Sequence, residues 1–94
     1  MAHLKRFLIE REIPGVGNFS MTELCGAARA SNQALDTLGP RIQWQHSYVA
    51  GDKTFCIYLA DDESAIREHS ELSGIPAGKV TEIEQIIDPL TANH

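Results

Sequence analysis

His46 lies in the densest group of reactive side chains in this sequence. The segment WQHSYVAGDKTFCIY, residues 44–58, contains His46, Cys56, both tyrosines and the only tryptophan. Neutral imidazole is a common metal ligand, and its pKa lies close to physiological pH. This segment is therefore the leading candidate for a functional site. The alternative role for His46 is a hydrogen bond within a half-buried aromatic cluster.

Residues 42–60 predict the hairpin that positions this group. Two runs, 42–50 and 53–60, are rich in aromatic and β-branched residues, and Gly51-Asp52 separates them. Such a pattern is typical of a β-hairpin whose turn tolerates positive φ. Because side chains alternate between the two faces of a strand, the length of the turn decides which residues accompany His46.

Two registers fit this hairpin. A two-residue turn pairs His46 with Ile57, and a three-residue turn that includes Lys53 pairs it with Tyr58. The second is favoured because it places the strongest hydrophobes of the second strand under the helices. Those core residues are Phe55, Ile57 and Leu59. The other face then offers a ligand pocket lined by Trp44, His46, Tyr48, Cys56 and Tyr58.

His69 is a second candidate metal ligand. It falls on the inner face of a predicted helix, between Ile66 and Leu72. This helix carries no HExxH or ExxH chelate, so a metal site at His69 needs groups from elsewhere in the fold. The alternative is a core or interface histidine that is satisfied by hydrogen bonding.

Carboxylates form a third group. Glu10 and Glu12 alternate onto one face of the first predicted strand, and Glu82 and Glu84 do the same on the last. If these strands are neighbours, the carboxylates form a patch that, with an imidazole, suits a divalent transition metal. The alternative is a solvated sheet face.

The elements that carry these residues follow from periodicity and capping signals. Ser20 and Glu23 form a capping-box pattern at the start of a helix whose buried stripe begins at Met21. The expected elements are a strand over 4–12, a helix from Ser20 to Gly39-Pro40, the hairpin, a helix capped by Asp61 or Asp62 that runs to about Leu72, and a strand over 79–87. The order is β-α-β-β-α-β.

This order predicts an α+β, ferredoxin-like fold in which residues 1–94 form a single domain. Right-handed crossovers place the first and third strands at the centre of a four-stranded antiparallel sheet, with the fourth strand beside the first. Both helices cover one face of the sheet. The other face is left for dimerisation or for a ligand pocket.

Composition excludes several classes of function. The net charge is −5, with 13 acidic and 8 basic residues among 94, which argues against a nucleic-acid surface. The apolar run FLI is too short for a signal peptide or a membrane span, so we expect a cytoplasmic protein. Cys25 and Cys56 match no disulfide or zinc framework, and we expect both to be reduced and partly buried. No standard catalytic motif is present.

Three segments resemble a known family. They are FLIEREIPG (7–15), IQWQHSYVAGDKTFCIYLADDESAIREH (42–69) and GIPAGKVTEIEQIIDPLT (74–91). Together they resemble a small bacterial ferredoxin-like family, formerly of unknown function and typified by an actinobacterial nickel-binding protein. Ser70 and Ile75 depart from the family pattern, where alanine and an aromatic residue are expected.

The resemblance implies a homodimer that holds nickel at its surface and serves in sequestration or detoxification. His46, Glu68 and His69 lie in matching segments and are the candidate metal ligands. The function expected is non-enzymatic binding of a divalent metal, nickel first, with copper and zinc also suited to imidazole. The competing hypothesis is a dimeric α/β-barrel-type enzyme or ligand-binding protein, in which His46 acts as acid or base within the open-face pocket.

Overall fold

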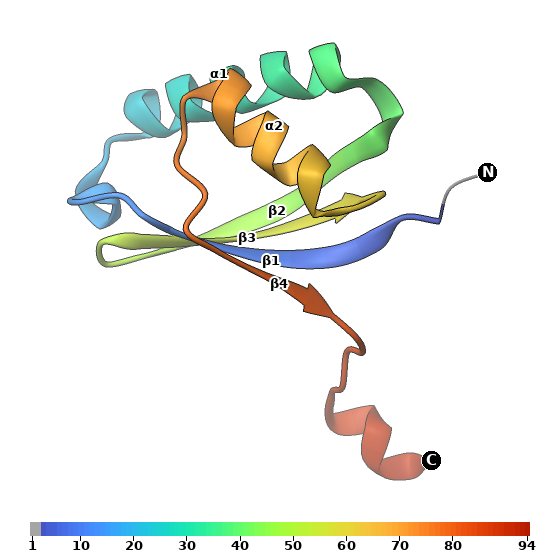
Figure 1. Ribbon diagram of the computed structural model, residues 1–94. Coiled ribbons are helices and arrows are strands. Elements are labelled where there is room, and N and C mark those ends of the chain that lie inside the picture. Colours follow the sequence, from blue (N-terminus) through green and yellow to red (C-terminus); the bar gives the residue numbers. More distant parts are fainter. Residues whose placement is uncertain (1–2) are drawn as a thin grey trace.

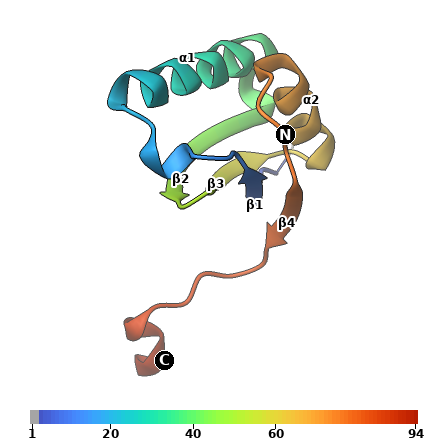
Figure 2. The same ribbon diagram turned by 90° about the vertical axis from the view of Figure 1, so that its left-hand side faces the viewer.

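The chain folds as a four-stranded antiparallel sheet with two helices on one face (Figures 1 and 2). The computed structural model describes residues 3–94. Its main elements are β1 (Lys5–Glu12), α1 (Met21–Leu38), β2 (Ile42–Ala50), β3 (Lys53–Ala60), α2 (Glu63–Ser73) and β4 (Lys79–Ile83). The strand order is β2-β3-β1-β4, which confirms the predicted α+β arrangement and places β1 and β3 at the centre.

Both helices begin and end as their sequence signals predict. At the start of α1, Glu23 N donates to Ser20 Oγ at 3.2 Å, and Ser20 N donates to Glu23 Oε1 at 3.1 Å. This reciprocal pair is the predicted capping box. Asp62 caps α2 and accepts a hydrogen bond from Ser64 N. Gly74 ends α2 in the left-handed conformation, with φ of 73°, which glycine adopts without steric cost.

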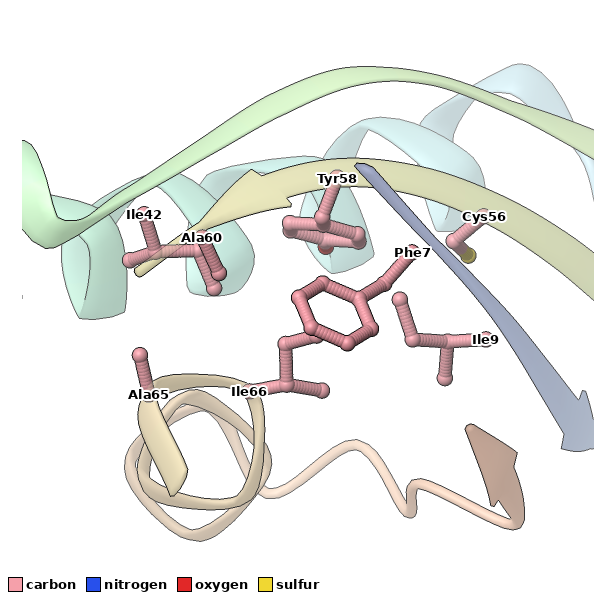
Figure 3. Close-up of a cluster of buried hydrophobic side chains, with 8 residues drawn as sticks. All are labelled: Phe7, Ile9, Ile42, Cys56, Tyr58, Ala60, Ala65 and Ile66. Carbon is pink, nitrogen blue, oxygen red and sulfur yellow. The ribbon is translucent and has the colours of Figure 1, made fainter. Parts of the chain in front are cut away.

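The hydrophobic core lies between the sheet and the helices, and much of it faces α2 (Figure 3). Phe7 and Ile9 of β1 point into it. The buried residues of the core cluster are Phe7, Ile9, Ile42, Cys56, Tyr58, Ala60, Ala65 and Ile66. Two expected members of the helix stripes are exposed instead: Met21 lies at the first turn of α1 and Leu72 at the last turn of α2.

The favoured register of the β2–β3 hairpin is wrong. The turn has two residues, so Ala50 pairs with Lys53 and His46 with Ile57. Gly51 supplies the positive φ, and the β1–α1 loop holds the turn: Ile13 N donates to Asp52 O, and Gly15 N to Asp52 Oδ1, each at 2.8 Å. These contacts fix Gly51-Asp52 as the whole turn.

As a consequence, the two faces of β3 are the reverse of those predicted. Cys56 and Tyr58 are buried under the helices, where Cys56 is 5% exposed and Tyr58 3%. The helix-free side, called here the open face, carries the larger apolar side chains. Its large apolar and aromatic members are Leu8, His46, Tyr48, Phe55, Ile57, Leu59 and Ile83.

A β-bulge at Gln45 separates the two halves of β2. Trp44 pairs with Tyr58, but the next pairing joins His46 to Ile57, so Gln45 is an extra residue. An extra residue reverses the alternation of side chains beyond it. Trp44 therefore faces the helices, where its ring stacks on Tyr58 with 6.4 Å between centroids, whereas His46 faces the open side.

The last strand is shorter than predicted and its carboxylates do not form the predicted patch. β4 ends at Ile83, not at residue 87. Glu82 pairs with Phe7 and Glu10 with Lys79, so the two carboxylates lie on opposite faces of the sheet. Because side chains alternate along each strand, the observed pairing puts Glu10 on the helix-free face and Glu82 on the helix side.

Residues 84–94 form a tail that leaves the body of the molecule (Figures 1 and 2). It ends in a short 3₁₀ helix, Pro89–Asn93, capped by Asp88, which accepts a hydrogen bond from Leu90 N at 2.9 Å. Ile86, Ile87 and Leu90 are 67%, 76% and 70% exposed. Over residues 3–94, no helix is long and apolar enough to cross a membrane.

Candidate functional site

A cavity of about 330 Å³ opens between the first three turns of α1 and the helix-side face of the sheet. We call it the α1 cavity. Apolar side chains form most of its wall, with Arg11, Ser31, Ser47 and Thr54 as polar groups. The lining residues are Arg11, Met21, Leu24, Cys25, Ala27, Ala28, Ser31, Trp44, Ser47, Val49, Thr54, Cys56, Tyr58 and Ile75. This is the size range of small-molecule sites.

Arg11 is the charged residue of the α1 cavity. It is only 2% exposed, because it follows Phe7 and Ile9 at the next helix-facing position of β1. Its Nη1 donates to the carbonyl oxygens of Ile75 and Pro76, at 2.9 and 3.0 Å. None of the ion pairs formed within residues 3–94 includes Arg11. The guanidinium carbon lies 6.0 Å from the centroid of the Tyr58 ring.

A chain of neutral polar groups lies beneath the cavity. Tyr58 Oη is 3.3 Å from Ser31 Oγ, which is 3.0 Å from His69 Nε2. Burial raises the pKa of Tyr58, and the hydrogen bond with Ser31 and the charge of Arg11 oppose this only in part. Burial lowers the pKa of His69, and the nearby charge of Arg11 lowers it further. Both groups are therefore neutral near pH 7.

His69 is a buried structural group. It is fully buried between α2 and α1, and Nε2 also lies 3.3 Å from the Ser31 carbonyl oxygen. The other ring nitrogen, Nδ1, has no hydrogen-bond partner within the described chain. Solvent does not reach this imidazole, which makes it a poor first contact for a metal ion arriving from solution.

His46 occupies a different environment, on the exposed side of β2. Its Nε2 lies 3.1 Å from Tyr48 Oη, and the two rings meet edge to face with 5.1 Å between centroids. Both side chains stand on the open face, since they are two residues apart on one strand. This imidazole is available to solvent and to a second molecule.

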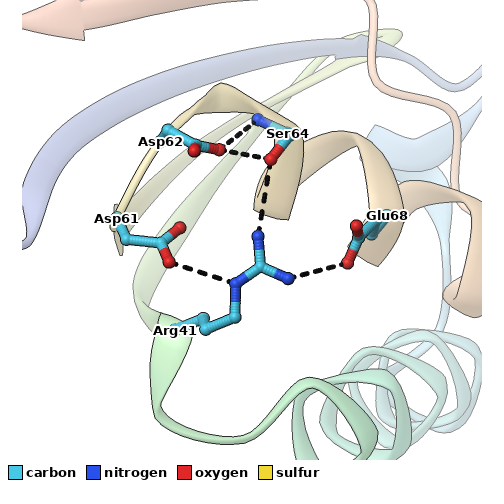
Figure 4. A network of polar contacts seen from close by, with 5 residues as sticks. All are labelled: Arg41, Asp61, Asp62, Ser64 and Glu68. Carbon is cyan, nitrogen blue, oxygen red and sulfur yellow. Dashed lines mark hydrogen bonds and ion pairs between the residues drawn. The ribbon is translucent and has the colours of Figure 1, made fainter. Parts of the chain in front are cut away.

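Glu68 is held by Arg41 on the outer surface of α2 (Figure 4). Arg41 Nη1 donates to Glu68 Oε2 and Arg41 Nε to Asp61 Oδ2, each at 3.1 Å. The hydrogen bond to Asp61, with the charge of that carboxylate, raises the pKa of Arg41. Hydrogen bonds from Ser64 lower the pKa of the neighbouring Asp62. Glu68 thus belongs to a surface ion-pair network that joins the end of α1 to α2.

The three candidate metal ligands do not meet within one chain. His46 lies on the open face, His69 in the interior and Glu68 on the outer side of α2. No group of three histidine, cysteine or acidic residues positioned to hold a metal occurs in the part of the chain that the structure describes. A metal site built on His46 therefore needs ligands from a second molecule or from water.

The candidate ligand pocket is likewise divided between two faces. Trp44, Cys56 and Tyr58 line the α1 cavity, whereas His46 and Tyr48 stand on the open face. Both cysteines are free; Cys56 is buried, as a small core residue, but Cys25 is exposed at the cavity wall, contrary to expectation.

Arg11 is the site residue that the sequence-based reasoning missed. The sequence does place Arg11 with Phe7 and Ile9, because residues 7, 9 and 11 lie on the same face of the first strand. A charged residue at an inward position of a central strand is uncommon and is a marker of a polar site. Ser31, a polar residue in the middle of the buried stripe of α1, likewise indicates a polar site in the interior.

Comparison with known proteins relates this fold to one family. The family model described as "Nickel responsive protein SCO4226-like" matches residues 7–83. A solved structure, described as a crystal structure analysis of SCO4226 from Streptomyces coelicolor A3(2), aligns with a TM-score of 0.73 at 14% identity. That alignment covers 87% of this chain and 99% of the other. No curated protein matches.

Proposed function

Because this chain belongs to the SCO4226-like family of nickel responsive proteins, we propose that it is a non-enzymatic nickel-binding protein. It works as a homodimer in the cytoplasm, where it sequesters or detoxifies the metal. The observation that carries this proposal is the exposed imidazole of His46, next to Tyr48 on a face with no helix cover. Imidazole nitrogen suits nickel, and also copper and zinc.

The geometry of His46 fits the role of one ligand in a shared site. Its Nε2 lies within hydrogen-bond distance of the Tyr48 hydroxyl, which orients the ring and leaves Nδ1 for the metal. A single imidazole gives weak binding. The chain supplies no complete ligand set around it within residues 3–94, so a second copy is required to raise the number of ligands.

The open face and the tail support a dimer. The open face presents Leu8, Phe55, Ile57 and Leu59 from its two central strands, and Tyr48 beside them is 59% exposed. The tail presents a second exposed apolar surface on the same chain. A two-fold axis lets each molecule bury both surfaces at once, since an isologous interface uses the same patches on both partners.

Titration calorimetry with nickel tests the proposal on tag-free protein. We expect wild type to bind nickel and His46→Ala to lose at least half of the sites or tenfold in affinity. The matched control is His94→Ala, which removes an exposed imidazole from the tail and should bind like wild type. Equal stoichiometry and affinity in His46→Ala would exclude His46, and absence of binding by wild type would exclude the function.

A further inference from the structure

We propose that the α1 cavity is a second site, which binds a small amphipathic carboxylate with its anionic head on Arg11. The site lies on the helix side of the sheet, whereas His46 lies on the open face. It is therefore independent of the proposed nickel function, and the failure of one does not affect the other.

The first support is the charge of Arg11. An ionised side chain that is 98% removed from solvent is costly unless a counter-charge or a full set of hydrogen bonds compensates it. Arg11 has two hydrogen bonds, both from Nη1 and both to neutral carbonyl oxygens. The fork formed by Nε and Nη2 is left for a planar anion, which guanidinium binds through two parallel hydrogen bonds.

The second support is the chemistry of the surrounding groups. Tyr58 and His69 near Arg11 are neutral, and no carboxylate within residues 3–94 forms an ion pair with the guanidinium. Burial raises the pKa of Tyr58, so its hydroxyl stays protonated and can donate either to Ser31 Oγ, 3.3 Å away, or to an anion. The polar end of the cavity is thus a cluster of donors with one positive charge.

The third support is the rest of the wall. Leu24, Ala28, Trp44 and Val49 give the cavity an apolar body, and Met21, at the first turn of α1, also lines it. One charged anchor in a cavity with a largely apolar wall selects a ligand with one anionic head and a hydrocarbon or aromatic body. A volume of about 330 Å³ limits that body to a short chain or a single ring system.

Trp44 gives a direct readout, because the only tryptophan of the chain lines the cavity. Titration with octanoate should change its fluorescence saturably, and octanol, with a similar chain and no charge, should bind at least tenfold more weakly. That ratio follows from the roughly tenfold or greater contribution of a hydrogen bond to a charged group. Equal affinities for the two compounds would overturn the role of Arg11, and no saturable change with octanoate would overturn the site.

Two variants separate binding from folding. Arg11→Gln should abolish the preference for octanoate over octanol, with Arg29→Gln, an exposed arginine of α1, as the matched control that retains it. Ala28→Phe places a ring on the cavity wall and leaves Arg11 in the sequence, and it should abolish octanoate binding while circular dichroism shows an intact fold. If Arg11→Gln does not fold, Ala28→Phe decides: a folded Ala28→Phe that binds octanoate like wild type would overturn the proposal.

Discussion

His69 shows at the residue scale how burial decides the role of a reactive side chain. Its imidazole is one of the three largest fully buried side chains, together with Ile9 and Ile66. One nitrogen is paired with Ser31 and the other has no partner within the described residues. Protonation would place a positive charge near Arg11, and no acidic side chain within residues 3–94 pairs with either group, so the folded state holds His69 neutral.

This neutrality makes stability depend on pH. Burial holds the pKa of folded His69 below the usual value near 6.5, to which the imidazole returns on unfolding. Between these two pKa values the unfolded state binds more protons, so the free energy of unfolding falls as pH is lowered. We expect a loss of up to about 1.4 kcal/mol per pH unit below pH 6.5, measured by urea denaturation from pH 8 to pH 5.

His69→Phe supplies the comparison for this prediction. The variant keeps an aromatic ring at the site but cannot take up a proton, so its unfolding free energy should fall less steeply between pH 6.5 and pH 5. His94→Gln removes an exposed imidazole and should keep the wild-type slope. Parallel slopes for wild type and His69→Phe would mean that carboxylates account for the whole dependence.

At the scale of elements, strands and helices were predictable from the sequence, but the relation between their faces was not. The limits of β2 and β3, the capping box at Ser20 and the cap at Asp62 all follow from local signals. The bulge at Gln45 does not, because no residue type there demands an extra position. A single inserted residue was enough to separate Trp44 from His46 and divide the predicted pocket.

The turn illustrates the same limit. Whether Gly51-Asp52 alone makes the turn depends on its contacts with the β1–α1 loop, which is distant in sequence. Hydrophobicity favoured Phe55, Ile57 and Leu59 as core residues, but the space beneath the helices takes Cys56, Tyr58 and Ala60. The larger apolar residues then lie on the open face, where the proposed dimer would cover them.

Two glycines give a matched test of how elements meet. A Cβ on Gly78 would lie 2.7 Å from the carbonyl oxygen of Glu10, where the chain enters β4 beside β1. Gly78→Ala must therefore move backbone, and we expect it to lower the unfolding free energy by about 1–3 kcal/mol. Gly26→Ala, in open space on α1, should raise it by roughly 0.5–1 kcal/mol.

Chemical denaturation of the two alanine variants measures both effects. Both variants replace glycine by alanine. Opposite signs of the change in unfolding free energy would therefore come from the close backbone contact at Gly78 and not from the loss of glycine itself. A Gly78→Ala variant as stable as wild type would show that the start of β4 can shift away from β1 without cost.

The molecule as a whole exposes several large apolar side chains that are not buried in its core. The open face and the tail each present large side chains to solvent, and the tail reaches away from the body (Figure 1). The tail also lies beyond residue 83, where the family match ends. The interface of the proposed dimer therefore has two separable parts: the open face, which lies within the family match, and the tail, which lies outside it.

Replacing two apolar residues of the tail by serine tests this division. We expect Ile87→Ser combined with Leu90→Ser to weaken dimerisation at least tenfold, because burial of each side chain is worth about 1.5–3 kcal/mol. Both residues are about three-quarters exposed in the single chain, so the fold of the protomer should be unchanged. Sedimentation velocity over a concentration series measures the dissociation constant, and Asn93→Ser, a polar change in the same segment, is the control.

The outcomes of this test distinguish the parts of the interface. A weaker dimer in the double variant, with nickel stoichiometry per dimer unchanged, would mean that the tail contributes to dimerisation and that nickel binds at the open face. An unchanged dissociation constant would show that the sheet faces alone hold the dimer. A wild-type protein that stays monomeric at all concentrations would contradict the dimer itself, and with it a nickel site that depends on ligands from two chains.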